Sequence, residues 1–164
     1  MNYRRLFVPN SIIFVTIVTY ERQPILIQNI VKVKRAIKEV YPFYKFKILA
    51  YSILNDHIHF LIKPQEITDY PKIIRAIKYN FTVGIAMPTY KKFLQNRYFE
   101  HTIRNEKDLY RHLDYIHYNS MKHYNILPKN WNSSSFRHFV KSGYYEENWC
   151  NSLNRYDINS LNYE

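Results

Sequence analysis

KFKILAYSILNDHIHFLIK, residues 45–63, contains two apolar runs separated by residues that favour a turn. Residues 45–54 and 57–63 each have the length and the β-branched and aromatic content of a strand. Asn55 and Asp56 lie between the two runs and have the side chains that turns prefer. The pattern therefore predicts two antiparallel strands joined by a tight hairpin.

The segments on either side of this hairpin predict the rest of an α+β fold. Two further strands are expected, at residues 11–19 and 98–103. Apolar residues at helical spacing predict three helices, at residues 25–41, 70–86 and 105–123, the last of them capped by Asn105. The order βαββαβ followed by a helix is typical of a ferredoxin-like antiparallel sheet. Beyond Trp131 the pattern weakens, and a tail is expected.

Length and composition predict one domain in a reducing compartment. The chain has 164 residues, which allows it to bury about 70% of the surface that the unfolded chain exposes. No repeat or Gly/Ser linker divides it. Cys150 is the only cysteine, so a disulfide scaffold is excluded and a cytoplasmic location is expected. The apolar run at residues 11–19 is too short for a membrane helix, and no membrane is expected as a partner.

The charge balance favours nucleic acid as a partner. Lys and Arg number 24 against 13 Asp and Glu, a formal charge of +11, and 17 Tyr and 10 Phe are interleaved among them. Phosphates complement the cations, and aromatic rings can stack on unpaired bases. The alternative is the composition bias of an AT-rich genome, which does not by itself account for the low number of acidic residues.

His57 and His59 form the first candidate site. Residues two apart on a strand point to the same face, so both imidazoles converge there while Ile58 and Phe60 face the core. Two neutral imidazoles are a partial site for a divalent metal, which needs at least one more ligand. The alternative is a pair of polar side chains on an open sheet face.

The third helix adds further candidates. Tyr115 and Asn119 are one turn apart, on a face that also carries Asp108 and His112. A phenol and a carboxamide opposite a histidine pair suit phosphoryl transfer, in which the tyrosine attacks and a metal neutralises the phosphate oxygens. Spacing alone leaves Tyr118 open as the nucleophile. His101 and His112 are expected to satisfy core or capping hydrogen bonds, and the alternative is a supporting role near the metal.

Three motifs, taken together, resemble a known family. They are HIHFLI at residues 57–62, YFEHTIRNEKDLYRHLDYIHYNSMKH at 98–123 and FVKSGYYEENW at 139–149. In this order they resemble the REP-associated tyrosine transposases, relatives of the single-tyrosine HUH transposases of small insertion sequences. The resemblance implies an HUH endonuclease type of fold. It also implies a single catalytic domain, which we place at residues 1–145, followed by a C-terminal tail at residues 146–164.

The resemblance also implies roles for particular residues. His57 and His59 would hold a divalent metal, Mg²⁺ or Mn²⁺, and Tyr115 of the DYI motif would be the nucleophile. Asn119 would be the third metal ligand. The family usually continues Asn-Pro-Val-Lys, whereas here Ser120 follows Asn119, so the helix is expected to run on.

These roles predict a metal-dependent single-stranded DNA endonuclease and strand transferase, a transposase that cleaves at or near hairpin-forming repeats through a 5′-phosphotyrosine. The expected partner is single-stranded or hairpin DNA, and the protein is expected to be a monomer or homodimer. One alternative is a non-catalytic binder of single-stranded nucleic acid with a ferredoxin-like fold. Another is a metal-dependent hydrolytic nuclease. The cations expected to contact DNA are Arg4, Arg5, Lys72, Arg75, Lys78, Arg104 and Lys122. The alternative for the basic amino-terminal end and for the face formed by Lys72, Arg75 and Lys78 is a plain solvated surface.

Overall fold

A computed structural model of the chain describes residue 5 and residues 7–85 and 92–150, and its elements follow the predicted order. The strands are β1 (Ile13–Val18), β2 (Phe46–Ile53), β3 (His57–Pro64) and β4 (Phe99–Thr102). The α-helices are α1 (Ile30–Lys38), α2 (Tyr70–Ile85), α3 (Glu106–Tyr124) and α4 (Phe136–Lys141). Short 3₁₀ turns lie at Tyr20–Arg22, Ile27–Asn29, Ile67–Asp69 and Pro128–Asn130. Arg4, and residues 151–164 of the expected tail, lie outside the described residues.

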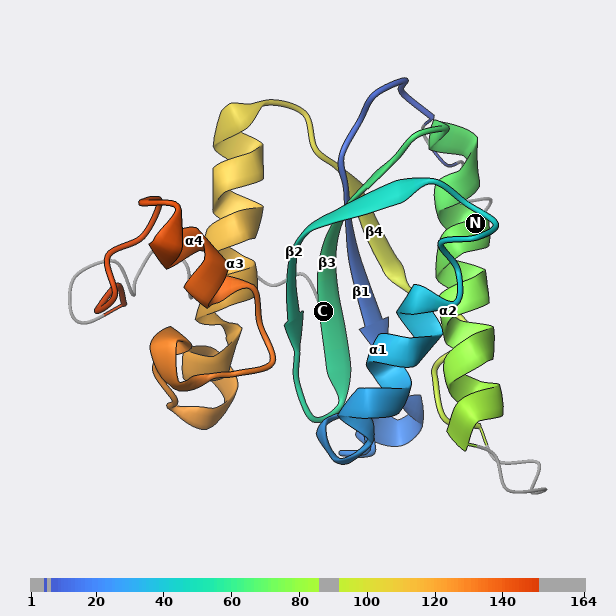
Figure 1. Ribbon diagram of the computed structural model, residues 1–164, viewed down its shortest axis with the longest axis horizontal. Coiled ribbons are helices and arrows are strands. Elements are labelled where there is room, and N and C mark those ends of the chain that lie inside the picture. Colours follow the sequence, from blue (N-terminus) through green and yellow to red (C-terminus); the bar gives the residue numbers. More distant parts are fainter. Residues whose placement is uncertain (1–4, 6, 86–91, 151–164) are drawn as a thin grey trace.

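The four strands form one antiparallel sheet with the order β2-β3-β1-β4 (Figure 1). β1 pairs with β3 on one side and with β4 on the other, and β2 pairs with β3. The register places Thr16 of β1 opposite His59 of β3. This is the predicted ferredoxin-like α+β arrangement, and it puts the histidine pair on an inner strand.

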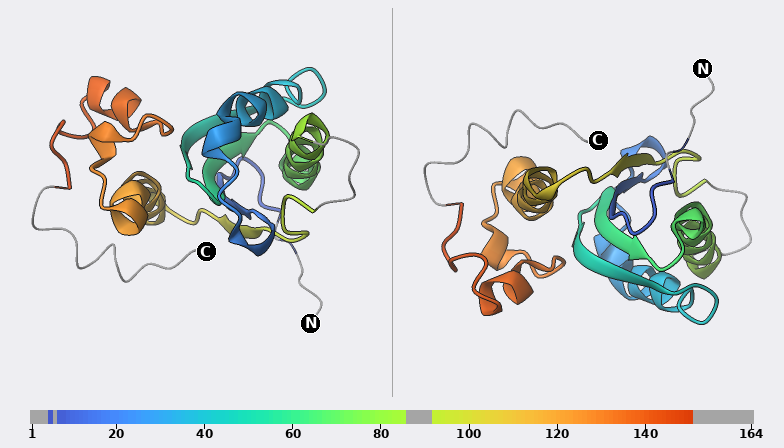
Figure 2. Two further views of the ribbon diagram at one scale, coloured as in Figure 1. Left: turned by 90° about the horizontal axis from the view of Figure 1, so that it is seen from below. Right: turned by 90° about the horizontal axis from the view of Figure 1, so that it is seen from above.

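Helices cover both faces of the sheet (Figure 2). α1 and α2 lie over one face, whose core includes Ile17 and Phe60. α3 packs on the other face, where Ile116 joins Phe14 and Leu61 in a second core, and α4 lies beside α3. Because side chains alternate along each strand, the sheet supplies one apolar surface to each helical layer.

Residues 133–135 run along the outer edge of β2. The Ile53 N–H donates to the Ser133 carbonyl over 2.8 Å, and the Ser135 N–H donates to the Tyr51 carbonyl over 3.0 Å. The segment therefore satisfies backbone groups that an edge strand leaves open.

The expectation of a tail directly after Trp131 is wrong, because the chain folds back and forms α4. Phe136 of this helix is fully buried, and its ring stacks on that of Tyr145 with centroids 5.2 Å apart. A helix of six residues is too short for a periodic apolar pattern to stand out in the sequence.

α1 is shorter than predicted. It begins at Ile30 rather than residue 25, because the 3₁₀ turn Ile27–Asn29 precedes it and Asn29 departs from helical geometry, with φ −113° and ψ 25°. The Asn29 side chain donates to the Ile25 carbonyl over 2.8 Å, which stabilises this turn. The helix ends at Lys38, before the predicted residue 41.

α3 continues past Asn119 to Tyr124, as the absence of a following proline predicts. The Asn105 side chain accepts a hydrogen bond from the Asp108 N–H over 2.9 Å, which confirms the predicted N-terminal cap. Asn125 ends the helix in the left-handed conformation, with φ 55°. Asn119 therefore lies inside the helix.

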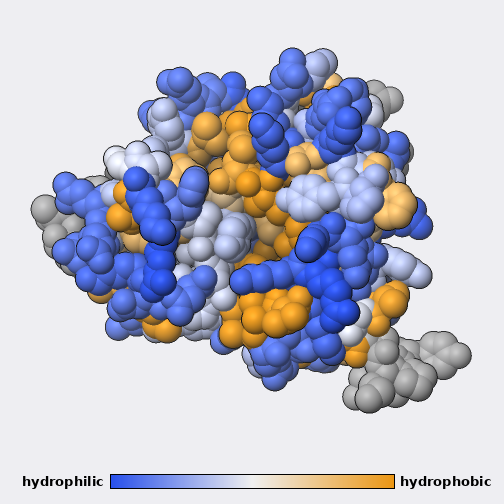
Figure 3. Space-filling view, viewed as in Figure 1, coloured by the Kyte–Doolittle hydropathy of each residue, from blue (hydrophilic) through white to orange (hydrophobic). Residues whose placement is uncertain are grey.

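Hydrophilic side chains make up most of the face of the molecule that Figure 3 shows. On the face seen in Figure 3, apolar side chains gather in a hollow between α1 and β2. The hollow has a volume of ≈ 320 Å³ and is lined by Lys34, Ile37, Tyr41, Ile48, Tyr51, Ile53 and Phe60. Within the described ranges, no helix combines the length and the apolar character needed to span a bilayer.

Candidate active site

His57 and His59 lie side by side on β3, on the face of the sheet that α3 covers. Both side chains are fully buried, and their ring centroids are 4.8 Å apart. Ile58 and Phe60, which alternate with them, belong to the core under α1 and α2. The alternation predicted from the HxH spacing is confirmed. The alternative of an open sheet face is wrong, because α3 covers these side chains.

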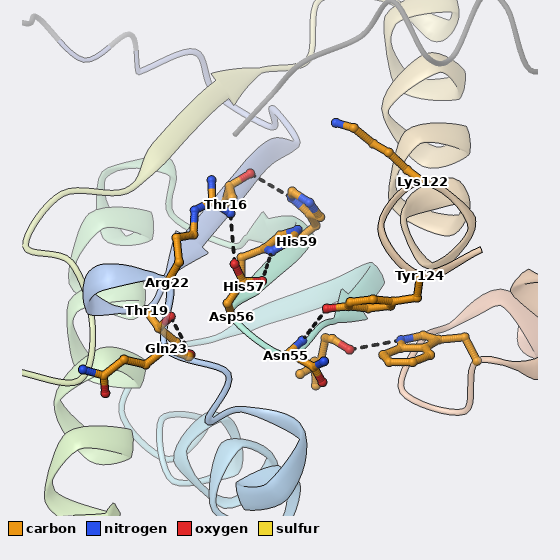
Figure 4. Close-up of polar contacts among 12 residues, drawn as sticks. Thr16, Thr19, Arg22, Gln23, Asn55, Asp56, His57, His59, Lys122 and Tyr124 are labelled. Carbon is orange, nitrogen blue, oxygen red and sulfur yellow. Dashed lines mark hydrogen bonds and ion pairs between the residues drawn. The ribbon is translucent and has the colours of Figure 1, made fainter. Parts of the chain in front are cut away.

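Each imidazole is held through its Nδ1 atom (Figure 4). His57 Nδ1 lies 2.7 Å from Asp56 Oδ1, and His59 Nδ1 lies 2.8 Å from Thr16 Oγ1. Arg22 donates to Asp56 Oδ2 over 3.3 Å. Burial alone would raise the pKa of Asp56, but the hydrogen bonds from His57 and Arg22 outweigh it and lower that pKa. A hydrogen bond at one ring nitrogen fixes the ring orientation and is usual for metal-binding histidines.

The turn between β2 and β3 is tied to its neighbours. The Asn55 N–H donates to the Tyr124 hydroxyl at the end of α3 over 2.9 Å (Figure 4). The Thr19 N–H donates to the Asp56 carbonyl over 2.8 Å, and the Leu26 N–H donates to the Asn55 carbonyl over 2.9 Å. These bonds hold the histidine pair and the end of α3 in a fixed relation.

Tyr115 lies on α3 against His59. It is fully buried, and the two ring centroids are 5.3 Å apart. Lys122 Nζ donates to the Tyr115 hydroxyl over 3.3 Å. Tyr118, which spacing had left open as the nucleophile, packs in a different cluster with Met121. The structure thus brings Tyr115 to the histidine pair.

Asn119 follows Tyr115 by one helical turn and is fully buried. Its Nδ2 donates to the Tyr115 carbonyl over 2.7 Å. Its buried Oδ1 has no hydrogen-bond partner among residues 5, 7–85 and 92–150. Leaving such an atom unsatisfied costs about 1–3 kcal/mol. A carboxamide oxygen is also a ligand that hard divalent cations accept, so Asn119 fits the role of a ligand beside two imidazoles.

The sequence prediction missed His123, whose ring centroid lies 4.9 Å from that of His57. Tyr115, Asn119 and His123 are spaced by four residues and therefore share one face of α3. This spacing is visible in the sequence and could have indicated that His123 faces the pair.

A second group with metal-type ligands joins β4 to α3. Ligand atoms of His101, Asp108 and His112 lie within 4.8 Å of one another. Asp108 lies 2.8 Å from His101 Nε2 and 3.1 Å from His112 Nδ1, and it accepts from the Arg104 N–H over 2.9 Å. Burial would raise the pKa of Asp108, but the hydrogen bonds from His101 and the Arg104 amide lower it. The three side chains have the ligand set of a metal site. Through its contact with Asp108, His112 also makes the kind of hydrogen bond that the sequence predicted for it.

The cations expected to contact DNA are dispersed. Arg5 pairs with Glu100 of β4 over 3.1 Å, and Arg104 is exposed just before α3. Among the described members of the group, Lys122 is the one in contact with Tyr115.

α2, which carries three of these cations, lies on the opposite face of the sheet from α3, the helix that covers the histidine pair (Figure 2). Lys72 and Arg75 line a hollow between α2 and the segment that follows α1, together with aromatic side chains. Lys78 Nζ donates instead to the carbonyls of Gln95 and Asn96, over 2.7 and 2.8 Å, and supports the loop before β4. The structure therefore does not bring these three cations to the histidine pair.

The sequence of this site matches a known family. The profile of the family described as Transposase IS200 like matches residues 8–119, a span that includes β1, the histidine pair, Tyr115 and Asn119. The chain belongs to the IS200-like transposases.

The relatives that are most informative about this IS200-like transposase are REP-associated tyrosine transposases. A Haemophilus influenzae protein assigned to the REP-associated tyrosine transposases is 37% identical over 162 residues, covering 90% of this chain and 92% of the relative. The REP-associated tyrosine transposase of Escherichia coli is 30% identical over 154 residues, covering 92% of each. A solved structure of a REP-associated tyrosine transposase bound to a REP hairpin superposes with a TM-score of 0.85 at 29% identity, covering 96% of each chain. The family resemblance and the fold inferred from the sequence are confirmed.

Proposed function

We propose that this IS200-like transposase cleaves and rejoins single-stranded DNA beside hairpin-forming repeats, with Tyr115 as the nucleophile. His57, His59 and Asn119 bind a divalent metal, Mg²⁺ or Mn²⁺. The contact that carries the proposal is that between Tyr115 and His59, whose ring centroids lie 5.3 Å apart. It joins a side chain suited to attack phosphorus with a histidine pair suited to a metal.

The residues around the pair support metal binding. Asp56 and Thr16 engage the Nδ1 atoms of the two rings, so Nε2 is the nitrogen of each ring suited to a ligand bond. Asn119 Oδ1 is buried without a hydrogen-bond partner in the described part of the chain. When bound, the metal would neutralise charge on the phosphate oxygens and orient the scissile bond.

Tyr115 would react by direct displacement at phosphorus. Its hydroxyl oxygen forms a bond to phosphorus and releases its proton to water, while the bond between phosphorus and the 3′ oxygen breaks. The 3′ oxygen keeps the bonding electrons and takes up a proton, so a 3′-hydroxyl leaves and the 5′ phosphate stays on the tyrosine. Because this link retains the free energy of the phosphodiester, attack by a 3′-hydroxyl can rejoin a strand without ATP.

Hairpin DNA with a single-stranded flank is the proposed substrate. The solved REP-associated tyrosine transposase that this chain resembles was bound to a REP hairpin, and the match covers 96% of each chain. The formal charge of +11 complements the phosphate backbone. We propose that the hairpin anchors the DNA and that its flank reaches Tyr115.

Covalent trapping tests the proposal. The protein is incubated with a labelled hairpin carrying a single-stranded flank and Mn²⁺, then denatured, and the adduct is mapped by mass spectrometry. We expect the phosphate on Tyr115. Tyr115→Phe removes one oxygen and keeps the ring, so adduct and cut product should both vanish while hairpin affinity remains. Tyr118→Phe, which changes a different cluster of α3, should retain most of the activity.

The other outcomes identify the alternatives. An adduct on Tyr118 would transfer the role of nucleophile to that residue. Cut DNA without any adduct would indicate a hydrolytic nuclease. Hairpin binding with neither product would indicate a non-catalytic binder of single-stranded nucleic acid.

A further inference from the structure

Lys122 is in direct contact with the proposed nucleophile. Its Nζ donates to the Tyr115 hydroxyl over 3.3 Å and lies 5.1 Å from the ring centroid. The two residues are seven positions apart, about two helical turns, and therefore share one face of α3. Figure 4 shows the Lys122 side chain extending from α3 toward the strands that carry Thr16 and His59.

The surroundings strengthen the effect of this charge. Tyr115 is fully buried and Lys122 is partly buried, so water screens their contact less than it would at the surface. Lys122 also lies in the last turn of α3, where the helix macrodipole favours a cation. The location thus favours a positive charge next to the phenol oxygen.

We infer that Lys122 is a catalytic residue of strand transfer, whose ammonium holds the attacking oxygen of Tyr115 and stabilises the negative charge that this oxygen gains as it loses its proton in the attack on phosphorus. The inference rests on the proposed function and assigns Lys122 more than the phosphate contact expected from the sequence. A positioned cation of this kind stabilises the transition state more than the bound substrate, because the phenol is neutral in the bound state and its oxygen gains negative charge as the proton leaves.

The two roles differ in what they change. A lysine that only anchors a phosphate contributes to DNA affinity and to its salt dependence. A lysine that acts on the attacking oxygen changes the rate of adduct formation when all the enzyme is bound to DNA. Affinity and single-turnover rate must therefore be measured on the same variants.

Lys122→Met tests the inference, because it keeps most of the side-chain length and removes the charge. We expect the rate of adduct formation at saturating hairpin DNA and fixed Mn²⁺ to fall about 100-fold. Hairpin affinity measured without metal should change by less than about threefold, because many cations share that binding. Lys122→Arg should recover at least about tenfold of the lost rate, since it restores the charge. The matched control is Lys107→Met, an exposed lysine in the first turn of α3, which should behave as wild type.

The inference is overturned if Lys122→Met forms the adduct at a rate within about threefold of wild type. It is also overturned if the decrease in rate disappears at higher DNA concentration, or if Lys122→Arg is as slow as Lys122→Met. Should Lys122→Met fail to fold by circular dichroism, Lys122→Gln takes its place under the same criteria. A wild-type protein that forms no adduct at Tyr115 refutes the proposed function itself. A normal wild-type reaction with an unimpaired Lys122→Met refutes only the role of Lys122.

Discussion

Acid should destabilise this protein through His117 of α3. The side chain is 2% exposed. Its Nδ1 lies 3.2 Å from the Tyr145 hydroxyl, and its Nε2 lies 2.8 Å from Ser135 Oγ, so the ring links α3 to the segment that runs along β2. Burial lowers the pKa of His117 from 6.5 to about 3. The folded protein therefore keeps this ring neutral at pH values where the unfolded chain is protonated.

The size of the effect follows from proton linkage. Between the two pKa values, the unfolded state binds one more proton at His117 than the folded state does. The stability that the neutral His117 ring contributes is fully present above pH 6.5. Below pH 6.5, the free energy of unfolding decreases by about 1.4 kcal/mol for each pH unit. Between pH 6.5 and pH 4.5 this amounts to about 2.7 kcal/mol, which is large beside the ~5–15 kcal/mol of a typical domain.

Urea unfolding at pH 7.0, 5.5 and 4.5 measures this loss in wild type, His117→Gln and His138→Gln. His117→Gln keeps a polar side chain but cannot titrate. On going from pH 7.0 to pH 4.5, its free energy of unfolding should therefore decrease by about 2.7 kcal/mol less than that of wild type. His138 is exposed on α4, and its variant should follow wild type. Asp56 and Asp108, whose pKa values are also lowered, add the same acid sensitivity to every variant. Parallel pH dependences for wild type and His117→Gln would refute the reasoning.

Further predictions concern the active site and the DNA surface. Cleavage should be abolished by a chelator and by either His57→Ala or His59→Ala. Hairpin affinity, measured by fluorescence anisotropy, should fall by less than about threefold, because distributed phosphate contacts provide the binding. Cleavage by either variant at the wild-type rate in the same metal would contradict the assignment of the two histidines as metal ligands. Asp56→Asn should weaken Mn²⁺ binding by about 10–100-fold in calorimetry, since Asp56 orients His57 through a 2.7 Å hydrogen bond; an unchanged affinity would exclude that role. The double variant Lys72→Ala/Arg75→Ala should weaken hairpin binding and reduce its salt dependence. It should not slow adduct formation at saturating DNA, because α2 and α3, which carries Tyr115, lie on opposite faces of the sheet. A slower reaction would show that the two faces of the sheet are not independent.

Much of the fold could be predicted because its signals are local. The two apolar runs in residues 45–63 and the turn at Asn55 and Asp56 define the β2–β3 hairpin without reference to any other segment. The capping residue Asn105 marks the start of α3 in the same way. The 3₁₀ turn before α1 could not be predicted, because apolar spacing cannot distinguish one tight turn from the start of an α-helix.

The site could be predicted only in part, because several of its contacts depend on tertiary pairing. The convergence of His57 and His59 follows from strand geometry alone. The bond between Thr16 and His59 joins residues 43 positions apart and depends on the register of β1 against β3. The contact of Lys122 with Tyr115 lies within one helix, so spacing could have indicated it.

The segment along the outer edge of β2 also bears on how the chain reaches its folded state. An uncovered strand edge is a template for pairing with other chains, which leads to aggregation. Residues 133–135 are synthesised long after β2, so a chain emerging from the ribosome presents that edge until they follow. A truncation before Ser133 would keep every proposed catalytic residue and yet expose the edge permanently, and low soluble yield would be its first consequence.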